Sequence, residues 1–252
     1  MRTGQLCCSA MNDQSGRAES EPPVVALDGS AAVPAELYGR RAHKLAKLSA
    51  LGLPVPGGVA LSFASVAGIA RGEGLPRTPE QGSPSGLMVL RASPEQRDWG
   101  RVPSSPIIGI GETALPAFEA ALGPLVAVRL LAELIPQYAR LVHDVEPAVF
   151  EVIPSSGQAE SSPLEAMRYC LRQRLEIFRA EVGTPFPDSP IVQIEECICA
   201  MARSWCARSS RLLREARGAP PEAGVGVIIQ AAVLLGEDGR SGRGSIQGID
   251  SG

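Results

Sequence analysis

The sequence predicts an α/β fold that carries an inserted helical subdomain. Short β-type runs lie near its two ends, at residues 24–29 and 224–236, and helical periodicity dominates the region between them. Hydrophobic residues make up 44% of the 252 residues, which is enough for a buried core, but aromatic residues make up only 4%. We therefore expect aliphatic side chains and alanine to fill that core.

The first 111 residues alternate between strands and helices. Residues 1–22 are polar, without the apolar segment of a signal peptide, and we expect a disordered leader there. Residues 23–111 are the expected α/β part, with strands at 24–29, 57–63 and 87–93, a helix at 35–51, and a second helix that starts at residue 64 and ends at Gly72 or Gly74. The helix at 35–51 is expected to end at Gly52, because Pro54 follows. Its predicted apolar face consists of Leu37, Leu45, Leu48 and Leu51.

Residues 112–218 are expected to form the helical subdomain. Between 114 and 150, apolar side chains recur every three or four positions, at Leu130, Leu134, Tyr138, Leu141 and Val145. Further helices are expected at 163–183 and 191–218. Residues 219–252 then return to β structure, with a strand at 224–236 and a turn at 237–244, and we expect them to begin a second sheet.

Composition and motifs argue against several functional classes. The formal net charge of −3 is not typical of nucleic-acid binding, and no apolar run is long enough to cross a membrane. No P-loop motif is present. Two histidines, His43 and His143, without a G-x-S-x-G motif give hydrolase chemistry little support, and we interpret His143 as an ordinary surface or core histidine. Since no C-x-x-C pair occurs among the six cysteines, we expect no zinc site and a reducing, cytoplasmic location.

Five segments carry a family resemblance and cover most of residues 24–252. "YGRRAHKLAKLSALGLPVPGG" (38–58) is similar to G-G-K-x-x-x-L-x-x-(M/L)-x-x-x-G-L-P-V-P-x-G-F, and "LMVLRAS" (87–93) is similar to L-V-S-V-R-S. The segment 130–151 resembles Y-R-R-F-I-Q-M-(F/Y)-x-D-V-V. The segment 183–220 resembles a motif that begins F-P-x-D-P-x-x-Q-L. Residues 224–244 resemble G-T-A-V-x-V-Q-x-M-V-F-G-N followed by S-G-T-G. In this order, the motifs resemble the ATP-binding domain of the pyruvate, phosphate dikinase family.

The resemblance implies a partial ATP-grasp-like fold with ATP as the ligand. Arg91 matches an arginine that contacts the ATP phosphates in the family, and it is the candidate catalytic residue. Arg41 stands where the family has a phosphate-binding lysine, and a cation at a helix entrance can meet phosphate oxygens. The resemblance places the other cofactor-binding residues beside the adenine (Gln230, Ala231 and Val233) and in a hairpin close to the nucleotide (Ser241, Gly242 and Gly244).

Two functional hypotheses follow from this resemblance. In the first, the chain is the ATP-binding module of a kinase that acts with Mg²⁺ and with a separate polypeptide carrying the histidine and pyruvate domains. In the second, it is a catalytically inactive fragment or a regulatory, partner-binding protein. The second hypothesis rests on two departures from the family: Arg41 replaces the lysine, and the magnesium-binding residues are expected beyond residue 252. Phosphoryl transfer depends on such metal ions.

Overall fold

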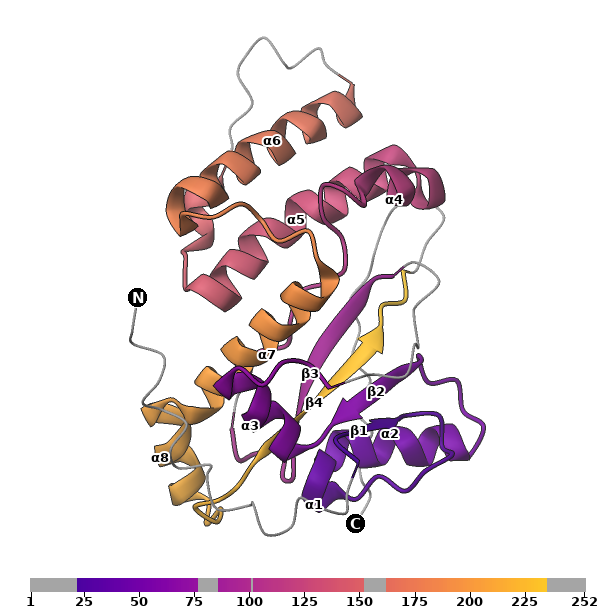
Figure 1. Ribbon diagram of the computed structural model, residues 1–252, viewed down its shortest axis with the longest axis vertical. Coiled ribbons are helices and arrows are strands. Elements are labelled where there is room, and N and C mark those ends of the chain that lie inside the picture. Colours follow the sequence, from indigo (N-terminus) through magenta and orange to yellow (C-terminus); the bar gives the residue numbers. More distant parts are fainter. Residues whose placement is uncertain (1–21, 77–85, 101, 152–161, 235–252) are drawn as a thin grey trace.

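The computed structural model describes residues 22–76, 86–100, 102–151 and 162–234. Within these ranges the chain forms one four-stranded sheet surrounded by helices, which confirms a mixed α/β fold (Figure 1). The strands are β1 (Val24–Ala26), β2 (Gly58–Leu61), β3 (Met88–Pro94) and β4 (Val225–Ala231). The helices are α1 (Ala35–Tyr38), α2 (Arg40–Ala50), α3 (Phe63–Arg71), α4 (Leu115–Leu122), α5 (Pro124–His143), the 3-10 helix η2 (Pro147–Phe150), α6 (Pro163–Val182), α7 (Pro190–Cys206) and α8 (Arg208–Ala216). No helix in the described ranges is long and apolar enough to span a membrane.

The sheet has the strand order β1-β2-β4-β3, and every neighbouring pair is antiparallel. Strand β4 lies in the middle, where it pairs with β2 on one side and with the whole of β3 on the other. The expectation that residues 219–252 begin a second sheet is therefore wrong for this strand. The physical reason is its apolar sequence, VGVIIQA, which is buried at six of seven positions and fits a strand covered on both faces.

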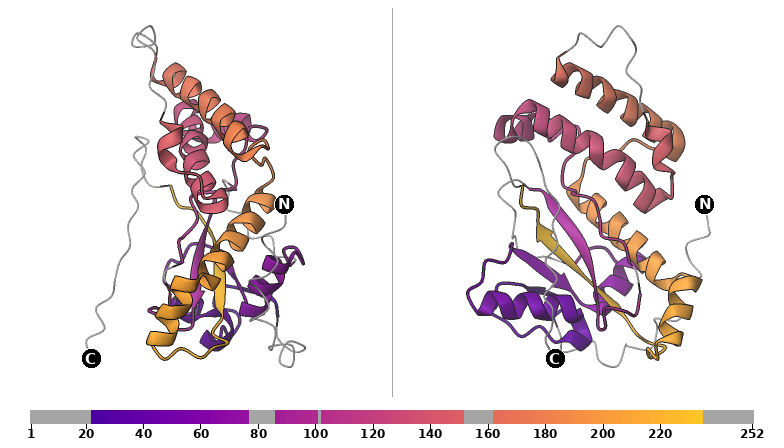
Figure 2. Two further views of the ribbon diagram at one scale, coloured as in Figure 1. Left: turned by 90° about the vertical axis from the view of Figure 1, so that its left-hand side faces the viewer. Right: turned by 180° about the vertical axis from the view of Figure 1, so that it is seen from behind.

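Helices cover the two faces of the sheet. On one face, α1 and α2 pack with Val25, Ala60 and Ile228. On the other, α3, α5 and α7 pack in a larger core with strand residues that include Leu61 and Val227. Helices α4 to α6 extend this second core beyond the strands, at one end of the molecule (Figures 1 and 2).

The helix predicted at residues 35–51 is two helices, because Gly39 breaks it with a φ of 83°. Its predicted apolar face is wrong in part, since Leu48 and Leu51 are 40% and 76% exposed. Ala42 and Ala46 are the buried residues of α2 instead. Small side chains on this face let the helix lie close to the sheet. The predicted end of the helix is confirmed, with Gly52 just after it at a φ of 73°.

The helical middle agrees with its predicted periodicity. Leu134 and Tyr138 are buried, and the other three residues of the repeat pack partly against the same core. The helix predicted at 191–218 instead breaks at Ala207, whose backbone is extended. The break lets Arg214 of α8 fold back on α7, where its guanidinium lies 4.1 Å from the ring centroid of Trp205 and donates to the carbonyl oxygen of Trp205 at 2.8 Å.

A buried glutamine joins α7 to the segment after β3. Gln193 accepts the N–H of Gly109 at 2.8 Å and donates to the carbonyl oxygens of Ile110 at 2.9 Å and Pro187 at 2.7 Å. The side chain is fully buried, so it satisfies three backbone groups that water cannot reach. This contact fixes the helical part against the sheet.

Candidate phosphate-binding site

The N-terminus of α2 lies against the end of strand β3. A Cβ on Gly39 would be only 1.7 Å from the carbonyl oxygen of Ser93. The buried Ser93 hydroxyl accepts the N–H of Ala42 at 3.1 Å. The glycine in "YGRR" is required because the backbone of β3 passes where any side chain would lie. This contact fixes the position of the two arginines that follow.

Three arginines, Arg41, Arg91 and Arg97, lie near this junction, with Arg91 and Arg97 within electrostatic range of Arg41. Arg41 keeps an exposed side, but its Nη1 donates to the carbonyl oxygen of Ala92 at 2.5 Å. Burial of this guanidinium and the like charges of Arg91 and Arg97 lower the pKa of Arg41. Among the described residues, none of the three forms an ion pair. An uncompensated group of guanidinium ions favours an anion, and its planar donors match phosphate oxygens.

Free backbone donors lie beside these side chains. The N–H groups of Arg40 and Arg41 have no hydrogen-bond partner within the described part of the chain, and Gly39 offers no capping side chain. Two cations in the first turn also oppose the helix dipole. A bound anion would satisfy the N–H groups and offset the repulsion at the same time.

Arg91 and Gln230 share one face of the sheet. Arg91 pairs with Ile228, and Gln230 is two residues further along β4, so the two side chains lie on the same side. This is the side on which α1 and α2 pack. Gln230 is buried, and its Nε2 donates to the carbonyl oxygen of Pro56 at 3.1 Å. The structure thus brings three of the predicted residues, Arg41, Arg91 and Gln230, to one face.

The remaining predicted residues are placed differently. Ala231 belongs to the opposite face of β4, and Val233 follows the strand and is 60% exposed. Ser241, Gly242 and Gly244 lie outside the described residues. Arg97, in the loop after β3, was not among the predicted site residues. No local feature of the sequence distinguishes Arg97 from other basic residues in loops.

A second group of ionisable side chains lies between α3, α5 and α7. His143, Glu195, Glu196 and Arg203 line a cavity of about 410 Å³ there. Most of their polar atoms serve the packing of the helices. The buried Tyr138 hydroxyl donates to Glu196, the N–H of Leu75 donates to Glu195 at 2.8 Å, and Arg203 donates to the carbonyl oxygen of Val142 at 2.7 Å. Burial lowers the pKa of His143, which keeps the ring neutral at pH 7.

Comparisons with known proteins complete the description of the site. Within the described residues, no three His, Cys, Asp or Glu side chains are grouped so that they could hold a metal ion. The resemblance to the dikinase family consists of the five sequence segments quoted above, and the comparisons add nothing to it. No protein-family model matches the sequence, and no curated protein is significantly similar to it.

Proposed function

We propose that this chain is an ATP-binding module and that Arg41 and Arg91 hold the phosphates of the nucleotide, while Arg97 adds positive charge beside them. The observation that carries the proposal is the position of Arg41, which enters α2 and reaches the backbone of Ala92 beside Arg91, within electrostatic range of Arg91 and Arg97. None of these three arginines has a carboxylate partner in the described part of the chain. Charged groups at the edge of a folded core require a counter-charge, and a phosphate chain supplies it.

The arrangement of β4 suggests how a nucleotide would lie. Its phosphates would sit near Arg91, opposite Ile228, and its adenine would lie toward Gln230 and Val233. The six residues from Ile228 to Val233 are separated by five steps, which span roughly 17 Å in extended conformation. That length leaves room for a sugar between the two ends of the ligand. The partial ATP-grasp assignment belongs to this proposal.

In a dikinase-type reaction, this chain would hold ATP while a separate polypeptide presents the histidine that accepts the phosphoryl group. Bound Mg²⁺ supplies neutralisation of the charge that develops between the phosphates. Arg91 would keep the phosphates in position and share in that neutralisation. Arg41 would anchor the same phosphates from the entrance of α2.

A second candidate function is an inactive, regulatory or partner-binding relative. It is favoured by one contact: Arg41 already donates to the carbonyl oxygen of Ala92, so part of its hydrogen-bonding capacity ties α2 to β3. An arginine used in this way can retain a bound anion without supporting phosphoryl transfer. Both candidate functions predict that the chain binds the nucleotide, but only the first predicts phosphoryl transfer.

Isothermal titration calorimetry with ATP, with and without Mg²⁺, tests the proposal. Arg91→Ala should weaken ATP binding by about tenfold or more, since a hydrogen bond to a charged group contributes roughly 1.5–3 kcal/mol. His143→Ala is the matched control, because His143 lies by α7 on the other side of the sheet and should leave binding unchanged. Absence of heat at millimolar ATP would refute the proposal. ATP binding without phosphoryl transfer to a histidine-carrying partner would select the inactive alternative.

A further inference from the structure

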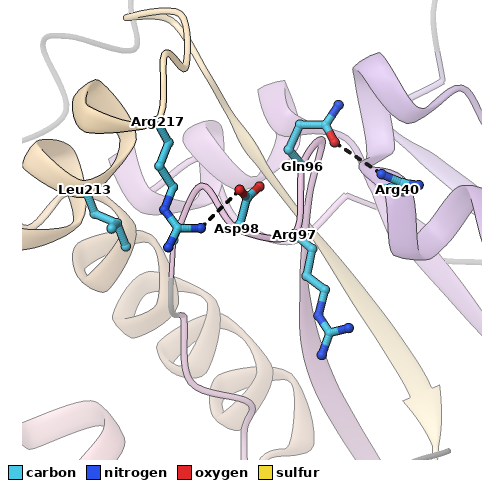
Figure 3. A pocket seen from close by; sticks show the side chains of 7 residues that line it. Arg40, Gln96, Arg97, Asp98, Leu213 and Arg217 are labelled. Carbon is cyan, nitrogen blue, oxygen red and sulfur yellow. Dashed lines mark hydrogen bonds and ion pairs between the residues drawn. The ribbon is translucent and has the colours of Figure 1, made fainter. Parts of the chain in front are cut away.

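A cavity of about 450 Å³ opens between the loop after β3 and the end of α8 (Figure 3). This size falls within the range of small-molecule sites. Its lining includes Arg40, Gln96, Arg97, Asp98, Leu213 and Arg217. The side chains come from three parts of the chain, namely α2, the loop and the end of α8.

The lining has a net positive charge, because three of its seven residues are arginines and one is an aspartate. The aspartate is already engaged, since Arg217 Nη1 lies 3.0 Å from Asp98 Oδ2. Among the residues that the structure describes, the Arg40 side chain makes one long hydrogen bond of 3.3 Å, to Gln96 Oε1. Figure 3 shows Arg97 extending away from the ion pair, without a partner among the side chains drawn. The cavity therefore has a formal excess of two positive charges.

Both walls of the cavity rest on Trp205, which is 1% exposed. On the loop side, a Cβ on Gly100 would be 2.8 Å from the Trp205 ring, so the loop backbone lies directly on the indole. On the helix side, Arg214 of α8 covers the ring at 4.1 Å. The indole nitrogen also donates to the carbonyl oxygen of Ala223 at 3.0 Å. The two walls are thus held at a fixed separation, and little ordering remains for a ligand to impose.

We propose that this cavity binds the dianionic head group of a small organic phosphate monoester, at a site separate from the nucleotide. The charge of a phosphate monoester matches the excess of two positive charges in the lining. Guanidinium groups from α2, the loop and the end of α8 can bind its oxygens from several directions. Leu213 gives the cavity an apolar wall that an ester group can contact and inorganic phosphate cannot. The site shares Arg40 and Arg97 with the neighbourhood of α2, whereas Asp98, Leu213 and Arg217 belong to it alone.

An NMR titration with phenyl phosphate, following the backbone amides of the whole chain, tests this site. We expect saturable shifts at residues 96–100 and 213–217. Asp98→Asn should tighten binding about threefold, because it removes the carboxylate that repels the ligand and competes for Arg217. Arg217→Gln should weaken binding about threefold or more, since it removes a cation and releases the Asp98 carboxylate. Arg211→Gln, on the exposed side of the same helix, should change nothing.

The outcomes separate this site from the nucleotide site. Phenyl phosphate binding that persists in saturating ATP, or that occurs where ATP itself does not bind, supports the cavity whatever the fate of the ATP-binding proposal. Equal affinities of the Arg217→Gln and Arg211→Gln variants would overturn it, as would an Asp98→Asn variant that binds no more tightly. A gain of affinity cannot arise from misfolding, so the Asp98→Asn variant keeps the test decisive. Inorganic phosphate should bind more weakly than phenyl phosphate, and equal affinity would remove the assignment to an ester.

Discussion

Replacing Gly39 by alanine should destabilise the protein much more than the same change at turn glycines with open surroundings. The added Cβ would lie 1.7 Å from the carbonyl oxygen of Ser93, and the φ of 83° is strained for any L side chain. The backbone strain costs about 1–2 kcal/mol, and forced separation of packed elements costs about 1–3 kcal/mol. Together they predict a loss of about 3 kcal/mol, which for a chain of this size lowers Tm by about 6–12 °C.

Two further glycines resolve these contributions. Gly52 has a φ of 73° with nothing within 4 Å of an added Cβ, so Gly52→Ala should show the backbone strain alone, about 1 kcal/mol. Gly57 has the same open surroundings without a positive φ, so Gly57→Ala should be neutral. Thermal and urea unfolding of the three variants measures the differences. If Gly39→Ala lost no more stability than Gly52→Ala, the contact between α2 and β3 that positions Arg41 would be wrong.

Two other predictions concern the contacts that hold the helical part on the sheet. Gln193→Leu leaves buried backbone groups of Gly109 and Ile110 without hydrogen-bond partners. Urea unfolding should therefore show that the free energy of unfolding falls by about 3 kcal/mol. In the control variant Gln173→Leu, on the surface of α6, it should fall by less than about 0.5 kcal/mol. The Thr113 hydroxyl donates to Asp188 at 2.6 Å and lowers the pKa of that carboxyl below 3.8. The contribution of Asp188 to the free energy of unfolding is therefore fully present above pH 3.8, and it is lost as the pH falls through the folded-state pKa. Asp188→Asn should therefore be less stable than the unsubstituted protein at pH 7, by less than about 1 kcal/mol because the site is exposed. Near pH 2 the two proteins should be equally stable. A stability difference that stays constant with pH would contradict this assignment.

Much of the local structure could be predicted because it depends on short-range chemistry. The helix ends at Gly52 and Gly72 follow from glycine in the left-handed region, and the strand at 87–93 follows from a compact apolar run. Within the candidate site, Arg41 and Arg91 could be named from the sequence alone. The segments that carry them resemble motifs of the dikinase family, and a cation at a helix entrance, as at Arg41, can meet phosphate oxygens.

The remaining features depend on contacts between distant segments. The apolar face predicted for residues 35–51 is wrong at Leu48 and Leu51, which are exposed. The periodicity of a helix shows which residues share a side, but it does not show which side meets the sheet. Arg97 was missed since nothing local distinguishes it, and its importance arises only when the loop after β3 returns to the N-terminus of α2. The break at Ala207 likewise depends on the stacking of Arg214 over Trp205.

The sequence by itself determined the positions of most helices and strands and the large share of alanine and aliphatic side chains in the core, where eight of the ten aromatic residues are buried as well. These properties follow from backbone preferences and hydrophobic periodicity, which act over a few residues. Only the tertiary structure decided that β4 enters the middle of the sheet, between strands that precede it by well over 100 residues. That pairing depends on burial on both faces at once, and it is what places Gln230 and Arg91 on one surface.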